Sequence, residues 1–123
     1  MQLGAFSISL SVKDITSSYD FYVKLGFEKA GGNIDENWLI MRNGDHVIGL
    51  FQGMFEGNLM TFNPGWDQQS NNLEEFTDVG TLQRELKDRG ISIPDEMAEQ
   101  EHGPKSFMIS DPDGNQILFD QHR

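Results

Sequence analysis

Histidine is the side chain best suited to bind a transition metal or to move protons near neutral pH. The sequence has three histidines, His46, His102 and His122, and a shared site would require all three to converge. His46 opens an extended segment, His102 lies in an acidic stretch, and His122 is the last residue but one. We therefore expect three unrelated surface histidines. Asp120 and Gln121, which precede His122, leave open the alternative of a site at His122.

The supply of nucleophiles is also limited. The sequence has no cysteine, which excludes a disulfide framework, a cysteine-ligated zinc site and a thiol nucleophile. Ser7, Ser9 and Ser11 alternate along one extended segment, but no Gly-x-Ser-x-Gly motif surrounds them and no histidine is near them in the sequence. We interpret these serines as small residues that keep a cavity open.

Aromatic side chains suggest a different chemistry, the binding of a planar organic molecule. Several of them gather in the first half of the chain and in the segment after it. They are Trp38, Phe51, Phe55, Phe62 and Trp66. Ordinary core packing and the wall of a binding pocket are both consistent with this cluster.

The net charge of the chain limits the classes of molecule that it can bind. It has 20 acidic and 9 basic residues, a net charge of −11. Nucleic-acid binding requires a basic surface, which this composition lacks, and an anionic membrane would repel the chain. The charge favours solubility, or the attraction of cationic ligands. The start of the chain has no signal-peptide pattern, and no apolar stretch approaches the ~20 residues of a spanning helix, so we expect a cytoplasmic protein.

The elements that must position these residues form a repeat. Apolar and small polar residues alternate over 6–12, with the two-residue period of a strand. Asp14 then begins a stretch with helical apolar spacing that ends at Gly26, and Asp78 and Gly90 bound a second stretch of the same length. Asp is a common helix N-cap, and Gly commonly follows the last residue of a helix. The repeat, at an offset of 64 residues, indicates two copies of one structural unit.

Extended segments follow each predicted helix, and turn sequences at Asn43-Gly44 and at 111–115 join the last two in each half. We predict strands at 27–32, 36–42 and 46–52 in the first half, and at 91–94, 105–110 and 115–120 in the second.

The start of the second copy is ambiguous, because either 59–62 or 72–77 could be its first strand; we favour 59–62 continuing loosely through 72–77. Residues 95–102 are acidic and rich in turn formers, and we expect a mobile surface loop there. The sequence therefore predicts an α+β fold with two tandem βαβββ modules in one domain. The domain is 1–123, module one is about 1–56, and module two is about 57–123.

Two groups of residues carry a family resemblance. The first is Val12-Lys13-Asp14, Ser18, Phe21-Tyr22 and Leu25-Gly26-Phe27, and the second is Asp111-Pro112-Asp113-Gly114-Asn115 followed by Ile117-Leu118-Phe119. In the order and spacing of these two groups of residues, the chain resembles the vicinal oxygen chelate superfamily. This superfamily includes glyoxalases, bleomycin-resistance proteins and extradiol dioxygenases. The resemblance implies an eight-stranded, partly closed sheet around a cavity, with the helices outside. It also implies a homodimer.

The resemblance further implies where a metal would bind, because metal-dependent members carry His, Glu or Gln at four positions facing the cavity. The corresponding residues here are Ser7, Gly49, Asn71 and either Ile117 or Leu118, with strand parity favouring Leu118. Divalent transition metals prefer imidazole, carboxylate or thiolate ligands. We therefore expect no metal and no cofactor. We also expect spare room at Gly49, opposite Phe51.

The leading hypothesis is a metal-free protein that binds a small, partly aromatic organic molecule in the sheet cavity, in the manner of a drug-sequestering resistance protein. One alternative is a lyase or isomerase with a non-standard active site, whose catalytic residues the sequence does not identify. A second alternative is a dimeric scaffold or regulatory protein. The predicted ligand-binding residues are Ser7, Ser9, Trp38, Gly49, Phe51, Phe62, Trp66, Gln116 and Leu118.

Overall fold

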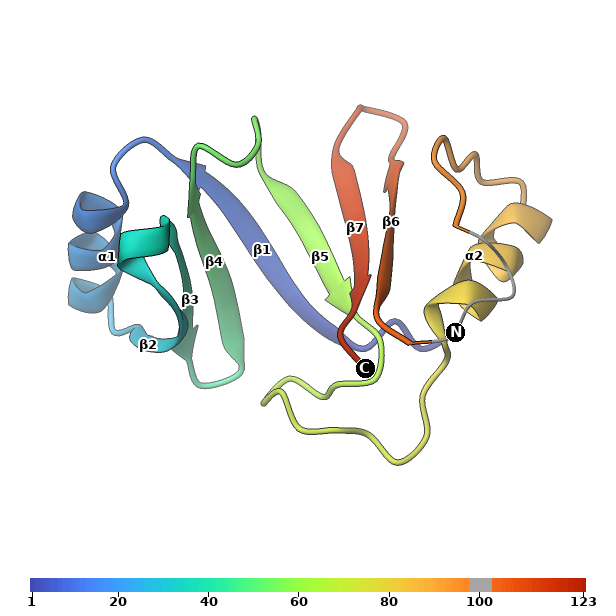
Figure 1. The fold of residues 1–123 in the computed structure, drawn as a ribbon, viewed down its shortest axis with the longest axis horizontal. Coiled ribbons are helices and arrows are strands. Elements are labelled where there is room, and N and C mark those ends of the chain that lie inside the picture. The colour runs from blue at the N-terminus through green and yellow to red at the C-terminus, as the bar shows by residue number, and fades with distance from the viewer. Residues whose placement is uncertain (98–102) are drawn as a thin grey trace. The chain divides into compact units, whose positions relative to one another are not determined.

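The computed structural model of the chain describes residues 1–97 and 103–123, so that His102 and the end of the predicted loop 95–102 lie outside the described residues. The described residues form seven β-strands, two α-helices and one short 3-10 helix (Figure 1). No helix among them is long and apolar enough to cross a membrane. The chain divides into a first unit, Ser7–Leu59, and a second unit, Met1–Phe6 with Met60–Arg123. Each unit has its own hydrophobic core.

The strands of the first unit lie in the order β2-β3-β4-β1. They are β1 (Ala5–Val12), β2 (Glu28–Asn33), β3 (Trp38–Asn43) and β4 (His46–Gln52). β4 pairs in parallel with β1 and antiparallel with β3, which in turn pairs antiparallel with β2. The predicted hairpin is confirmed, but its two-residue turn is Gly44-Asp45 and not Asn43-Gly44, since Asn43 pairs with His46.

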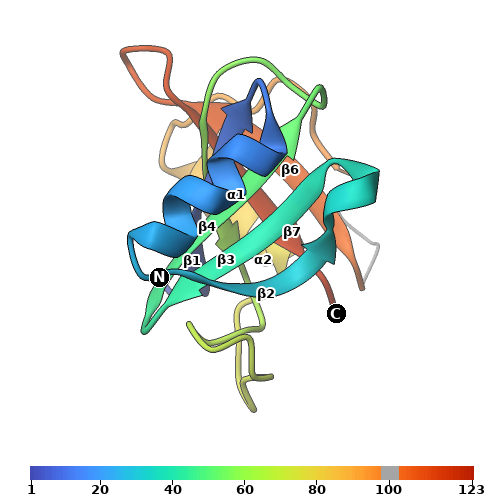
Figure 2. The same cartoon turned by 90° about the vertical axis from the view of Figure 1, so that its left-hand side faces the viewer.

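One face of the β3 and β4 strands is covered by α1 (Ile15–Lys24), as Figure 2 shows. Leu39, Met41 and Leu50 are fully buried on this face and form a core with Ile15. Burying one such side chain contributes about 1.5–3 kcal/mol. Because successive side chains of a strand point to opposite faces, the residues between them point away from α1.

The ends of α1 follow the predicted signals. The Asp14 side chain accepts hydrogen bonds from the backbone amides of Thr16 and Ser17, so it caps the helix N-terminus. Gly26 follows the helix with a φ of 104°, a conformation that favours glycine. The Phe27 amide then donates to the Tyr22 carbonyl oxygen at 2.9 Å. The two rings of that pair also meet edge to face.

The second unit contains three strands in the order β5-β7-β6, together with the second helix. They are β5 (Leu59–Asn63), α2 (Val79–Asp88), β6 (Lys105–Ser110) and β7 (Gln116–Gln121). β6 and β7 form an antiparallel hairpin. The helix packs its apolar side chains on Phe107, Ile109 and Phe119 of these two strands.

The two helices are built alike. The Asp78 side chain caps α2 by accepting from the Gly80 amide, and Gly90 (φ 87°) ends it as Gly26 ends α1. The Ile91 amide donates to the Leu86 carbonyl oxygen at 3.0 Å, which repeats the bond after α1. The predicted repeat of the helix ends is therefore confirmed.

A further repeat was not visible in the sequence. The last residue of β4, Gln52, accepts a hydrogen bond from the Ile15 amide at 2.8 Å. The last residue of β7, Gln121, accepts one from the Val79 amide at 2.7 Å. Each unit thus uses a glutamine at the end of its last strand to hold the first residue of its helix.

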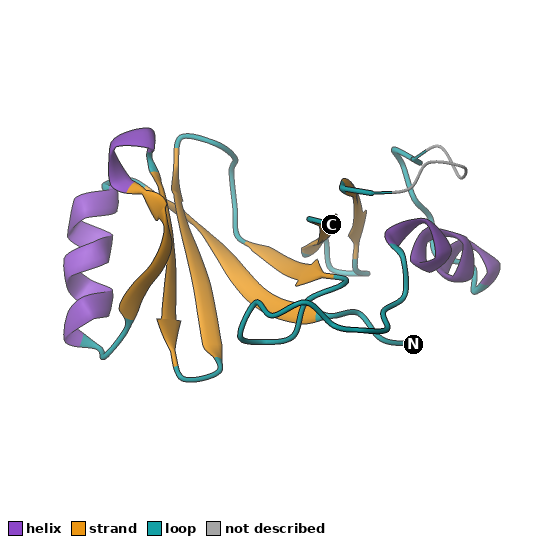
Figure 3. Ribbon diagram, turned by 60° about the horizontal axis from the view of Figure 1, so that its bottom comes forward, coloured by secondary structure: helices purple, strands orange, loops and turns teal. Residues whose placement is uncertain are grey.

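Two predicted extended segments, 36–42 and 72–77, need correction. Residues 34–36 form a 3-10 helix (Ile34–Glu36), and Asn37 adopts a left-handed conformation with φ 67°, so β3 begins at Trp38 and not at 36. Residues 72–77 are not a strand and contribute only an isolated bridge between Trp66 and Asn72. Figure 3 shows the connection from β5 to α2 as a long loop. The first strand of the second module is therefore β5.

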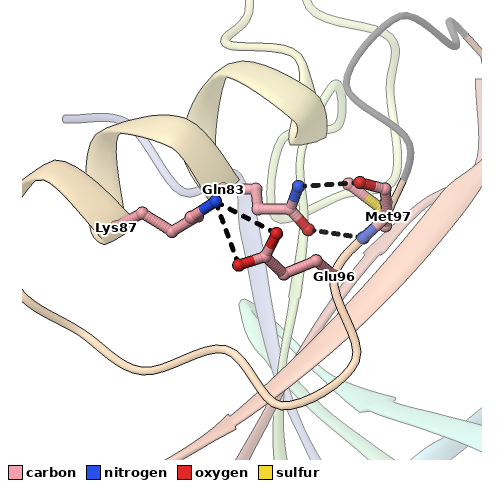
Figure 4. A network of polar contacts seen from close by, with 4 residues as sticks. All are labelled: Gln83, Lys87, Glu96 and Met97. Atoms are coloured by element: carbon pink, nitrogen blue, oxygen red, sulfur yellow. Dashed lines mark hydrogen bonds and ion pairs between the residues drawn. The ribbon is translucent and has the colours of Figure 1, made fainter.

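The predicted strand at 91–94 is wrong, and the described residues hold seven strands where eight were expected. Ile93 is buried in the core beside α2, and Pro94 has no amide hydrogen to donate to a neighbouring strand. Side-chain bonds replace strand pairing. The buried Gln83 amide makes two hydrogen bonds with the Met97 backbone, at 2.7 and 3.1 Å, and Lys87 pairs with Glu96 at 3.0 Å (Figure 4). The predicted closure of a sheet around a cavity stays a prediction.

Candidate functional site

The face of the first unit that points away from α1 carries a group of aromatic rings. Trp38 on β3 and Phe51 on β4 are direct cross-strand partners. Their rings are almost parallel, with centroids 6.5 Å apart and an interplanar angle of 8°. Phe55, just after β4, lies 5.4 Å from the Phe51 ring at 48°. We call these three half-buried residues, Trp38, Phe51 and Phe55, the aromatic face.

Phe55 is fixed in place by β1. The Ser11 hydroxyl donates to the Phe55 carbonyl oxygen at 2.8 Å, and the Ser11 amide donates to the Asn58 side chain at 3.1 Å. The segment after β4 is thereby tied across β1. Neither Phe55 nor Ser11 was among the predicted site residues, although both were visible as part of the aromatic cluster and the serine alternation.

The predicted serines accompany the aromatic face. In the parallel pairing of β1 with β4, Ser9 is opposite Gly49 and Ser11 is opposite Phe51. Neighbouring residues in a sheet point to the same side, so these hydroxyls lie beside the rings. Ser7 has the same parity on β1. The first unit therefore brings together five predicted residues on one face, namely Ser7, Ser9, Trp38, Gly49 and Phe51.

The spare room expected at Gly49 does not exist. A Cβ atom built on Gly49 would lie 2.4 Å from Cε2 of Phe51, far inside contact distance. The Phe51 ring folds back over its neighbour on the same strand and fills the space that a side chain at 49 would need. Gly49 thus serves the aromatic face by leaving room for the Phe51 ring.

The predicted residues of the second unit lie in three different places. Phe62 stacks on Phe119 at 5.6 Å and packs against the core, so its ring is part of that core. Gln116 and Leu118 alternate with the core-facing side chains of β7 and point to its other face. Trp66, in the loop after β5, stacks on His122.

The histidines do not form one site among the described residues. His46 is exposed at the start of β4. The His122 ring lies 4.8 Å from the Trp66 ring at an interplanar angle of 7°, and His122 Nε2 lies 3.2 Å from an Asp120 carboxylate oxygen. The Trp66 indole donates its N–H to Asn72 at 3.1 Å. At the site left open by the sequence, the His122 imidazole is therefore held in order between the Trp66 ring and the Asp120 carboxylate.

The pKa of one carboxyl group, that of Asp111, is lowered. In the turn between β6 and β7, the Asn115 side chain donates to Asp111 at 2.8 Å, and the amides of Asp113 and Asn115 donate to the same carboxylate. These bonds, the Asn115 side chain first, lower the pKa of Asp111. The carboxylate holds a turn, and its oxygens are already engaged.

The residues at the four metal positions do not fit a metal. Ser7, Gly49 and Leu118 offer no imidazole or carboxylate, and Asn71 lies in the loop after β5, where its amide groups bond to Asp67. In residues 1–97 and 103–123, no group of three or more His, Cys, Asp or Glu side chains could hold a metal ion. A step through a bound metal therefore has no support from these side chains.

The sequence profile of the Glyoxalase/Bleomycin resistance protein/Dioxygenase superfamily matches residues 4–119, which is nearly the whole chain. The chain belongs to this superfamily. A search of curated proteins gives no match.

Solved structures share the superfamily fold. A glyoxalase/bleomycin resistance protein/dioxygenase superfamily member from Vibrio splendidus aligns with a TM-score of 0.64 and 21% identity, over 94% of this chain and 97% of that one. A structure described as an NAD-dependent benzaldehyde dehydrogenase from Legionella pneumophila gives 0.68 and 16%, over 96% and 99%. Methylmalonyl-CoA epimerase from Streptomyces coelicolor gives 0.59 and 14%, over 98% and 99%. At these identities the likeness concerns the fold alone.

Proposed function

We propose that this superfamily member is a cytoplasmic, metal-free protein that binds a small, partly aromatic organic molecule on its aromatic face. The observation that carries the proposal is the parallel arrangement of Trp38 and Phe51 on a sheet face that no helix of the first unit covers. Planar ligands stack on such rings, and apolar surfaces with a few polar groups suit small organic molecules.

Two features of the first unit and one of the whole chain support this proposal. The rings are held by strand pairing and by the bond from Ser11 to the Phe55 carbonyl, so little ordering is needed on binding. The exposed Ser11 hydroxyl, whose proton goes to the Phe55 carbonyl, can accept a hydrogen bond from a polar substituent. The net charge of −11 favours a ligand that carries positive charge.

A titration of tryptophan emission tests the proposal. Trp66→Phe leaves Trp38 as the single tryptophan, and 9-aminoacridine supplies a planar cation. We expect saturable quenching of Trp38 emission, and a dissociation constant raised about two- to tenfold by Phe51→Leu, since the ligand loses a stacking partner worth about 0.5–1.5 kcal/mol.

The matched control is Phe21→Leu, because Phe21 is 60% exposed on α1, which covers the other face of the same sheet. This change should leave the dissociation constant unaltered. Equal affinity in the Phe51 and Phe21 variants would place the binding elsewhere.

We further propose that the chain folds as a single domain, 1–123. We also propose that two such chains form a homodimer. Among the described residues, β2 and β6 are the two end strands of the sheet order. Such edges favour pairing with another chain.

A further inference from the structure

The face of β7 that points away from the core carries an aspartate at its end, and a histidine follows just after the strand. Ile117 and Phe119 pack into the core, and Gln121 is 1% exposed. Asp120 lies between these inward-facing residues, and His122 follows with the same parity. Asp120 Oδ2 lies 3.2 Å from His122 Nε2.

The imidazole of His122 is also held on one face. The Trp66 ring lies parallel to it at a centroid distance of 4.8 Å. Trp66 is itself fixed, because its indole N–H donates to Asn72 and its backbone amide donates to the Asn63 carbonyl oxygen. One edge of the imidazole therefore faces a carboxylate, and one of its faces is covered by an ordered indole.

The backbone of His122 runs between two anchored residues. On one side, the Gln121 side chain bonds to the Val79 amide and the Asp78 carboxylate. On the other side, the Arg123 guanidinium donates to two carbonyl oxygens, of Gly65 at 2.9 Å and of Leu73 at 2.7 Å. The position of the imidazole is therefore set before any ligand arrives, as proton transfer requires.

The second ring nitrogen remains available. In the part of the chain that the structure describes, Nδ1 of His122 makes no hydrogen bond, and the side chain is 46% exposed. We propose that His122 is a general base that takes a proton at Nδ1 from a planar weak carbon acid, with Asp120 and Trp66 as positioning residues. The proposal does not rest on ligand binding at the aromatic face.

The surroundings of the imidazole suit this role. As Nδ1 takes the proton, the ring becomes an imidazolium, which the Asp120 carboxylate and the face of the Trp66 indole both stabilise. The C–H bond of the substrate breaks, and its electron pair stays on the substrate. Return of the proton to another atom of the substrate gives an isomerisation, and loss of a leaving group gives an elimination.

The test uses 5-nitrobenzisoxazole, a planar compound that reports on bases without a cofactor. Removal of its ring C–H proton forms a C≡N bond as the N–O bond breaks, and the phenolate product is coloured. We expect His122→Gln to lower the second-order rate constant by about 100-fold or more. Asp120→Asn should lower it by a smaller factor. His46→Gln, at the exposed histidine of β4, should leave it unchanged.

A second variant separates catalysis from folding. His122→Phe keeps a ring against Trp66 but cannot accept a proton, so it should fold and be as slow as His122→Gln. A wild-type rate no greater than that of free imidazole at equal concentration would overturn the proposal, as would full activity in the folded His122→Phe protein.

Discussion

At the scale of single residues, the aromatic face depends on one glycine. The Phe51 ring occupies the space above Gly49, so the two positions must be considered together. Strand parity correctly predicts that they share a face. It does not predict the rotamer of Phe51, because that depends on which neighbours leave room for the ring.

A methyl group at position 49 should displace the Phe51 ring. We expect Gly49→Ala to lower the free energy of unfolding by about 1–3 kcal/mol, through overpacking, and to weaken 9-aminoacridine binding. Chemical denaturation and the emission titration measure the two effects. The matched control is Gly31→Ala on β2, where a Cβ atom would meet only Ile40 at an ordinary 3.8 Å. Equal stability of the two variants would contradict this account of Gly49.

The Asp111 carboxylate gives a prediction with a defined sign. Its folded-state pKa is lowered from the ordinary value of 3.8, chiefly by the Asn115 side chain. The stability it contributes is therefore complete above that ordinary value and is lost as the pH falls through the lowered one. Asn115→Ala should move the pKa of Asp111 back up, as an NMR titration of the carboxyl carbon would show. An unchanged pKa would mean that the backbone amides alone hold the carboxylate.

At the scale of elements, the two helices share one construction. Each is capped by an aspartate, ended by a glycine and held at its first residue by a glutamine from the last strand of its unit. The aspartates and glycines are local signals with fixed spacing, so the sequence reveals them. The glutamine contacts join residues 37 and 42 positions apart, and no local pattern announces them.

The glutamine of the second unit should matter more than that of the first. Gln121 is 1% exposed, and Gln121→Leu would leave the buried Val79 amide without a partner, at a cost of about 1–3 kcal/mol. Gln52→Leu is the matched change in the first unit. The Ile15 amide there is only partly buried, so a smaller loss is expected. Urea denaturation of both variants tests the ranking, and a larger loss for Gln52→Leu would reverse it.

At the scale of the whole molecule, the repeat and the family were predictable because both rest on short motifs in a fixed order. The sequence did not predict that residues 91–94 would fail to form a strand. Ile91 and Ile93 alternate with polar Ser92, as a strand would. The segment is instead held by the contacts of Gln83 and Lys87, which pack it on α2. Phe62 illustrates a related point, since an aromatic residue on a strand is equally suited to a core and to a binding face, and the Phe62 ring packs against the core.

The proposed dimer is also a property of the whole molecule. Light scattering at micromolar concentration should give twice the 13.9 kDa mass of the chain. Exposed strand edges favour this association, although charged residues on β2, Glu28 and Lys29, oppose edge pairing there. A mass of one chain at every concentration would contradict the dimer and leave the binding proposal intact.

The central claim, metal-free binding of a planar molecule at the aromatic face, is tested most directly by native mass spectrometry. The protein is incubated with equimolar zinc and 9-aminoacridine and then desalted. We predict a 1:1 acridine complex with no retained zinc, and a lower abundance of that complex in Phe51→Leu but not in Phe21→Leu. One retained equivalent of zinc, or an acridine complex of equal abundance in the two variants, would contradict the claim.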